Sequence, residues 1–255
     1  MADFNTHIAT STVVGVGVGL AGYAILDTPE PSRVISCMLA TGLCSLAGIL
    51  PDLDSGSGRP LRETSSILAA VVPMLMVDRF QHMGMNAEAI ALAGALVYIT
   101  IRFGVVEIFK RYTVHRGMWH SIPAAISCTL LAFLVVSGEN LEVRIFKSAA
   151  VFIGFMVHLI LDEIWSVEWK GTHFHFKKSF GTAIKFWYAK NLWSNISTYG
   201  KLIALIFIAV GDPVMMEHYH FHRSQHEIQQ QLATEAEAEL QSPQIATEPM
   251  PTFNR

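Results

Sequence analysis

The chain has 255 residues, of which 51% are hydrophobic and 15% charged, and its formal net charge is -3. A soluble domain usually carries about 25% charged residues, so the composition favours a membrane protein. A net charge so close to zero does not indicate a nucleic-acid-binding surface. The apolar residues form long runs, and the predicted fold class is therefore all-α: a polytopic transmembrane helix bundle of about six to seven helices.

The first half of the chain contains four apolar segments that are candidates for membrane-spanning helices. They cover residues 8–26, 34–50, 65–77 and 87–109. A spanning helix needs about 20 mostly apolar residues. The third segment is shorter than that and contains Pro73, so the count of spans depends on it.

Two further apolar segments follow, at residues 122–136 and 145–165. A weaker seventh segment covers residues 202–210, or 202–216 in a longer alternative, and Lys201 and Asp212 bracket its most apolar part. Six spans are therefore predicted, and a seventh is added if this last segment also crosses the membrane.

Two polar stretches flank the seventh segment. Residues 166–198 mix Trp, Phe and Lys, a combination typical of the membrane interface. Residues 217–255 are polar, and residues 229–255 within them are rich in Gln, Ala, Glu, Ser and Pro, which is typical of a disordered tail. The predicted organisation is a transmembrane helical domain over residues 1–216 followed by a polar, largely disordered tail.

Six spans place the N-terminus, the loops after the second and fourth spans, and the segment after the sixth on one side of the membrane. Lys and Arg in short loops favour the cytoplasmic side. This side holds the larger set, so the sequence predicts a cytoplasmic N-terminus. The larger set is Arg59, Arg62, Lys110, Arg111, Arg116, Lys170, Lys177, Lys178, Lys185 and Lys190, and the smaller set is Arg33, Arg79, Arg144 and Lys147.

Histidine and aspartate residues form four clusters on that same side, and the first two lie at the ends of the first two spans. His7 lies at the mouth of the first span, where an ordinary interfacial histidine is the alternative. Asp52 and Asp54 follow the proline that closes the second span. In a turn, carboxylates two residues apart can reach one hard cation. The alternative is a solvated turn in which Asp54 caps the next helix.

The third cluster is the sequence His115-Arg-Gly-Met-Trp-His120-Ser121 after the fourth span. Two neutral imidazoles on either side of a glycine turn can converge on zinc or a similar ion. Arg116, between them, could bind a phosphate through paired N–H donors. The alternative is an interfacial loop in contact with lipid headgroups.

The fourth cluster lies within the sixth apolar segment. His158 and Asp162 are four residues apart, so they share one face of a helix, with Cβ atoms about 5–6 Å apart. Ionisable groups inside a membrane span are costly and usually mark a functional interior. A structural hydrogen bond could explain this pair by itself, but not the shared side of all four clusters.

A divalent metal site explains the shared side, because metal ligands must lie within about 2.0–2.6 Å of one cation. A mixed set of His and Asp favours zinc, with manganese or iron as alternatives, over calcium, and it could hold two ions. The predicted ligands are His7, Asp52, Asp54, His115, His120, His158 and Asp162.

These four motifs, in this order, resemble the YdjM-like family of bacterial inner-membrane proteins. The resemblance covers roughly residues 1–165. The family is described as LexA-regulated and membrane-bound, with a predicted metal-dependent, phospholipase-like hydrolase activity. The resemblance implies an inner-membrane location and metal ligation by the residues named above, with Asp54 either a ligand or a neighbour of the ligands.

The functional hypothesis is a hydrolase of the cytoplasmic face that acts on a phosphoester of a lipid or amphiphile. Asp54 or Glu163 would accept a proton from metal-activated water, and Arg116 would hold the anion. The alternatives are a non-catalytic metal-binding scaffold and a metal-ion carrier, which would also use Arg102 and Glu107. A signalling role for the aromatic interfacial segment is a third hypothesis.

Overall fold

The computed structural model describes residues 3–54, 58–105, 107, 117–170, 173–176, 181–220 and 223–224. The chain divides into two compact units, Met1–Asp212 and Pro213–Arg255. In the second unit, residues 213–220 and 223–224 are helical, while most of the predicted disordered tail lies outside the described residues.

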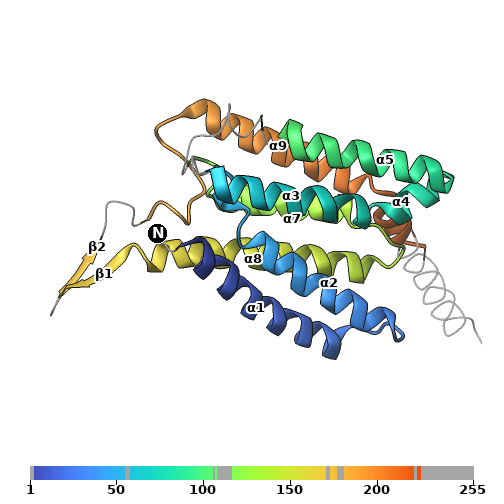
Figure 1. Ribbon diagram of the computed structural model, residues 1–255, viewed down its shortest axis with the longest axis horizontal. Coiled ribbons are helices and arrows are strands. Elements are labelled where there is room, and N and C mark those ends of the chain that lie inside the picture. The colour runs from blue at the N-terminus through green and yellow to red at the C-terminus, as the bar shows by residue number, and fades with distance from the viewer. Residues whose placement is uncertain are drawn as a thin grey trace, which may run out of the picture. The chain divides into compact units, whose positions relative to one another are not determined.

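The first unit is a helix bundle, which confirms the predicted all-α class (Figure 1). A short antiparallel hairpin follows the longest helix, at the place where the sequence indicated the membrane interface. The elements, in chain order, are α1 (Phe4–Ile25), α2 (Ser32–Ala47), the 3-10 turn η1 (Pro51–Asp54), α3 (Gly58–Leu75), α4 (Val77–His82), α5 (Ala87–Ile99), the π-helical turn η2 (Thr100–Val105), α7 (Ile122–Val135), α8 (Leu141–Ile164), β1 (Val167–Lys170), β2 (His173–Phe176) and α9 (Leu192–Val210).

Each predicted span corresponds to a helix, although the helices differ in length. Among the described residues, four helices are long and apolar enough to cross a membrane: α1, Ala87–Gly104, α8 and α9. The apolar helices α2 and α7 are shorter. The doubtful third span is the helix α3, which keeps Pro73 inside it and begins with polar residues.

α9, the helix that corresponds to the seventh predicted segment, begins ten residues earlier than predicted, at Leu192 rather than Leu202. Asn191 starts it, because its side chain accepts a hydrogen bond from Ser194 N at 3.2 Å. Such a cap satisfies one of the backbone N–H groups that a helix leaves unbonded in its first turn. The predicted interfacial segment, 166–198, therefore ends in the first two turns of α9.

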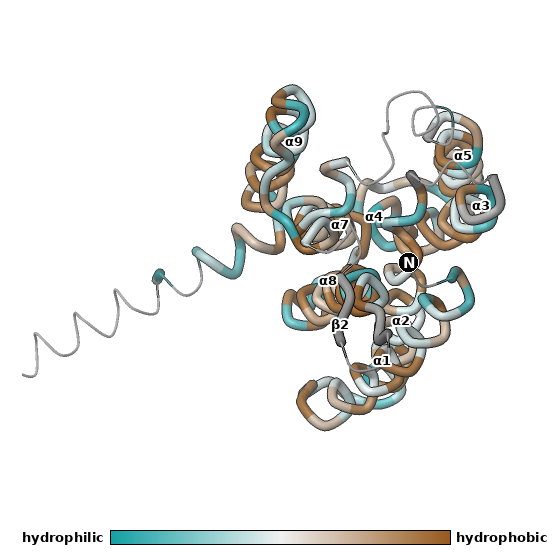
Figure 2. The backbone as a smooth tube through the Cα atoms, turned by 90° about the vertical axis from the view of Figure 1, so that its left-hand side faces the viewer, coloured by the Kyte–Doolittle hydropathy of each residue, from teal (hydrophilic) through white to brown (hydrophobic). Residues whose placement is uncertain are grey.

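α8 lies at the centre of the bundle, in contact with α1, α2 and α7 (Figure 2). Gly154 of α8 lies directly against α2, since a Cβ at this position would overlap the Cys44 carbonyl oxygen. Gly48 plays the same part between α2 and α1, where a Cβ would overlap Ser11. Small residues allow such close approach of membrane helices, and here they bring three helix ends together.

Candidate metal centre

His and Asp side chains from four segments of the chain lie close to one another. The start of α1 and the end of α8, which carry three of them, lie at the same end of the bundle (Figure 1). His7 is in the first turn of α1, Asp52 is in η1, and His120 lies in the turn before α7. His158 and Asp162 are in the last two turns of α8. The start of α1, the end of α2, the start of α7 and the end of α8 meet at this end because consecutive spans run in opposite directions.

The potential ligand atoms form two overlapping groups. His7, His158 and Asp162 make one group, and Asp52, His120 and His158 make the other; within each, the ligand atoms lie within 4.8 Å of one another. His7 Nε2 is 3.5 Å from Asp162 Oδ1. His158 Nε2 is 3.7 Å from Asp52 Oδ1 and 3.9 Å from Asp162 Oδ2.

These three N–O distances fit a shared cation better than they fit direct hydrogen bonds. A protein hydrogen bond joins N and O atoms about 2.7–3.2 Å apart, so all three pairs are too far apart. Two ligands about 2.1 Å from the same ion can be separated by at most about 4.2 Å, and all three pairs lie inside this limit. The residues therefore fit a metal ion by the geometry of their own atoms.

The ring of His158 is oriented by a backbone group. Its Nδ1 lies 2.7 Å from Gly48 O, and because a carbonyl oxygen can only accept, Nδ1 carries the proton and donates it. The unprotonated Nε2 then faces the two carboxylates, and within the described part of the chain it has no hydrogen-bond partner. A second hydrogen bond of this kind is typical of metal-binding histidines.

The cluster is almost completely shielded from solvent. His7, His120, His158 and Asp162 are each at most 1% exposed, whereas the Asp52 side chain is 14% exposed. The His7 ring stacks on the His158 ring at 3.7 Å, and the His120 ring meets it edge-on at 5.7 Å. Burying polar and ionisable groups is costly unless they are compensated, and a cation would compensate the carboxylates.

The two groups of potential ligands share one ligand atom. Both groups of potential ligands include His158, and only its Nε2 is available because Nδ1 is bonded to Gly48. One imidazole lone pair binds one ion. His158 can therefore serve only one ion, whichever of the two groups holds it.

Hydrogen bonds to backbone groups hold the turns that carry these ligands. Trp119 Nε1 donates to Leu50 O at 2.9 Å, which joins the turn before α7 to η1. Ser11 Oγ donates to Ser45 O at 3.0 Å, which joins the start of α1 to the end of α2. The sequence prediction missed Gly48 and Trp119, although both lie within the motifs that carry Asp52 and His120.

The remaining predicted site residues are placed differently or lie outside the described structure. Glu163 points to the segment after the hairpin, where its carboxylate accepts hydrogen bonds from Gly181 N and, at 3.3 Å, from Ala183 N. It therefore anchors that segment to the end of α8, and a role as proton acceptor stays a prediction. His115, Arg116 and the side chain of Asp54 lie outside the described residues.

Comparison with known proteins agrees with the membrane character of the chain. A family model described as "YdjM inner membrane protein" matches residues 1–216. The match extends beyond the region of the motifs and includes α9. No curated protein and no solved structure matches the chain.

Proposed function

Because the chain belongs to the YdjM family of inner membrane proteins, we propose that it is a membrane-embedded, metal-dependent hydrolase. Its substrate would be a phosphoester of a lipid or another amphiphile. The observation that supports the proposal is the convergence of five largely buried His and Asp side chains, from four elements, at one end of the bundle. These are His7, Asp52, His120, His158 and Asp162.

Three imidazoles and two carboxylates would supply the ligands of a divalent metal centre, which could hold more than one ion. Zinc is the first candidate for this mixture of donors, and manganese and iron are alternatives. When bound, such an ion lowers the pKa of a coordinated water towards 7 and stabilises negative charge on phosphate oxygens. His115 would add a ligand from the segment next to His120, and Asp54, next to Asp52, would be either a further ligand or the proton acceptor.

The chain's own residues would position the substrate and accept the proton. Asp52 has the most exposed side chain of the five, so the substrate would approach from the side of η1. Arg116 is four residues before His120 and would bind the phosphate by paired N–H donors. Asp54 is the preferred proton acceptor, because both oxygens of Glu163 are bonded to backbone N–H groups.

The site would act on the headgroup region of the membrane. All five side chains lie at the ends of helices or in the adjoining turns rather than at their midpoints. The excess of Lys and Arg in the loops on this side favours the cytoplasmic leaflet. A lipid phosphate lies at that depth.

A metal-stabilised scaffold is the second candidate, and the burial of the cluster favours it. Four of the five side chains are at most 1% exposed, as expected for an ion that only holds helices together. A structural metal site is usually closed, whereas a catalytic one keeps a position for water or substrate.

Elemental analysis of the detergent-purified protein, followed by hydrolysis assays with a panel of phospholipids, tests both candidates. His158→Ala should lose the bound metal, whereas His82→Ala, which removes an exposed histidine of α4, should retain it. Full metal content in His158→Ala would exclude this cluster as the site. Stoichiometric metal without chelator-sensitive hydrolysis of any headgroup would favour the scaffold.

A further inference from the structure

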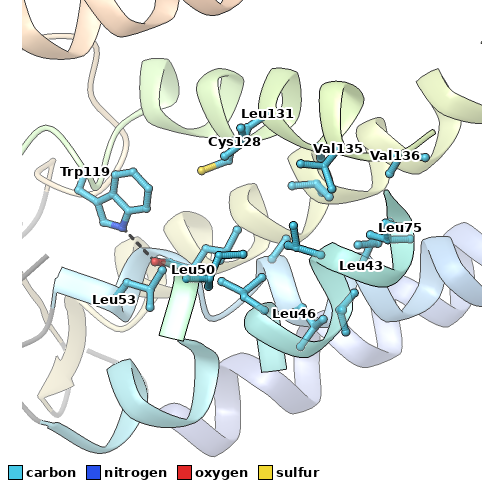
Figure 3. A pocket seen from close by; sticks show the side chains of 17 residues that line it. Leu43, Leu46, Leu50, Leu53, Leu75, Trp119, Cys128, Leu131, Val135 and Val136 are labelled. Atoms are coloured by element: carbon cyan, nitrogen blue, oxygen red, sulfur yellow. Dashed lines mark hydrogen bonds between the residues drawn. The ribbon is translucent and has the colours of Figure 1, made fainter. Parts of the chain in front are cut away.

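An apolar cavity of about 340 Å³, partly open to its surroundings, lies between helices of the bundle (Figure 3). Side chains of α2, α3, α7 and α8 surround it, together with residues of the neighbouring turns. They are Leu, Val, Ile and Ala residues with one cysteine, Cys128, and one tryptophan, Trp119. None of the proposed metal ligands that the structure describes lines this cavity, so the proposed hydrolase site does not explain why it exists.

One end of the cavity adjoins the metal cluster. Leu50 and Leu53 line it and lie on either side of Asp52 in the sequence. Trp119 also lines it and directly precedes His120. The hydrogen bond from Trp119 to the Leu50 carbonyl, drawn in Figure 3, lies at this end. The same two turns therefore carry metal-ligand candidates and the cavity wall.

The cavity extends from this end along α7 and α3. In Figure 3, Leu75 and Val136 lie at the end opposite Trp119. The stretch from Cys128 of α7 to Val136, which caps that helix, alone measures about 12 Å at about 1.5 Å per residue. At the far end, Ser137 joins the two helices, because its Oγ and its backbone N donate to Leu75 O at 2.7 and 3.2 Å. The space is thus elongated and runs parallel to the helices.

Water is a poor occupant of this cavity. A buried water needs two to four polar partners, and the lining consists of apolar side chains. The indole N–H of Trp119 already donates to Leu50 O. Inside a membrane, the abundant apolar molecule is the lipid acyl chain, which is also elongated and lies parallel to spanning helices.

We propose that the cavity binds one acyl chain of a membrane lipid and places its phosphate headgroup at the His and Asp cluster. This inference rests on the proposed function for the headgroup end and deepens it, because the substrate becomes a long-chain phospholipid or lysophospholipid. The length of the chain, rather than the headgroup alone, then selects the substrate.

Binding of lysophosphatidic acids to metal-free protein tests the proposal separately from any catalysis. The protein would be stripped of metal by a chelator, transferred to an amphipol, and titrated with butanoyl, octanoyl and tetradecanoyl forms. Affinity should rise by about fourfold for each methylene that becomes buried, until the chain fills the cavity. Equal affinity for all three chains would overturn the proposal.

Two variants of α7 form a matched pair. Ala132 lines the cavity, so Ala132→Phe should exclude at least two methylenes and weaken tetradecanoyl binding by about tenfold or more. Ile126 is exposed on the outer face of the same helix, and Ile126→Phe should bind as wild type. Unchanged binding by Ala132→Phe would contradict the assignment of the cavity.

A second cavity variant tests the proposal even if Ala132→Phe does not fold. Val72→Ala enlarges the cavity from the α3 side and should shift the preferred chain towards a longer one. An unchanged preference in a folded Val72→Ala protein would count against the proposal. His158→Ala should lose metal but keep chain binding, so failure of the metal site and failure of the cavity give different results.

Discussion

Replacing Gly154 by alanine should weaken metal binding although Gly154 is not itself a ligand. A Cβ at this position would overlap the carbonyl oxygen of Cys44 and lie 2.9 Å from the Cβ of Ala47. Ordinary van der Waals contact begins at 3.4 Å, and a backbone carbonyl cannot rotate away. α8 and α2 must therefore separate, by on the order of 1 Å, at an overpacking cost of about 1–3 kcal/mol.

This separation affects His158, which lies four residues later on the same face of α8. Its Nδ1 is 2.7 Å from Gly48 O, and a shift of about 1 Å takes the two atoms beyond hydrogen-bond range. Loss of a hydrogen bond that orients a ligand typically lowers metal affinity by about 10- to 100-fold. Gly154→Ala should therefore bind metal more weakly by that factor.

Competition with a chromophoric chelator in detergent measures the affinity. Gly42→Ala is the control, because Gly42 lies on α2 and a Cβ there meets no atom within 4 Å. An alanine at that position should leave the affinity unchanged and favour the helix slightly. If Gly154→Ala bound metal as tightly as Gly42→Ala, the link between helix approach and the orientation of His158 would be refuted.

Three further predictions concern contacts outside the cluster. Arg144, 2% exposed, donates to both carboxylate oxygens of Asp212, at 2.8 and 3.0 Å. Asp212→Ala leaves that guanidinium buried without its carboxylate and should lower the free energy of unfolding by about 3–5 kcal/mol. The control Glu30→Ala removes an exposed ion pair and should lower it by less than about 1 kcal/mol. Denaturation in mixed micelles measures both values, and equal values would contradict the prediction. Burial alone would raise the pKa of Asp212, but hydrogen bonds from Arg144 and Arg79 outweigh it and lower the pKa to about 2. The carboxylate's contribution to stability should therefore be complete at neutral pH and be lost only as the pH falls from about 4 towards 2, and a loss of this contribution at a higher pH would be the contrary result. Glu163→Gln should speed amide exchange at Gly181 and Ala183 without loss of metal, since its carboxylate accepts from both N–H groups; loss of metal in this variant would instead connect Glu163 to the cluster.

The membrane character and the shared end of the ligands could be predicted from the sequence. Apolar run length is a local property, and it located the helices that became α1 and α8. Because successive spans alternate in direction, the sequence placed His7, Asp52, His120 and the pair on α8 at one end of the bundle. In the described structure these five residues do lie close together. The start of α9 was predicted wrongly, because Asn191, its cap, was read as part of a polar interfacial segment.

The contacts that make these residues a site depend on tertiary structure. The sequence does not indicate that the Gly48 carbonyl would bind His158, or that Glu163 would point to the segment after the hairpin instead of towards Asp162. It also does not indicate the cavity beside Trp119, which exists only where α2, α3, α7 and α8 meet. Hydrophobicity and spacing are carried by neighbours along the chain, so the sequence by itself determined where the apolar helices lie and the end at which the polar residues gather. The direction of each side chain and the space left between helices arise from contacts between distant segments, and only the tertiary structure decided them.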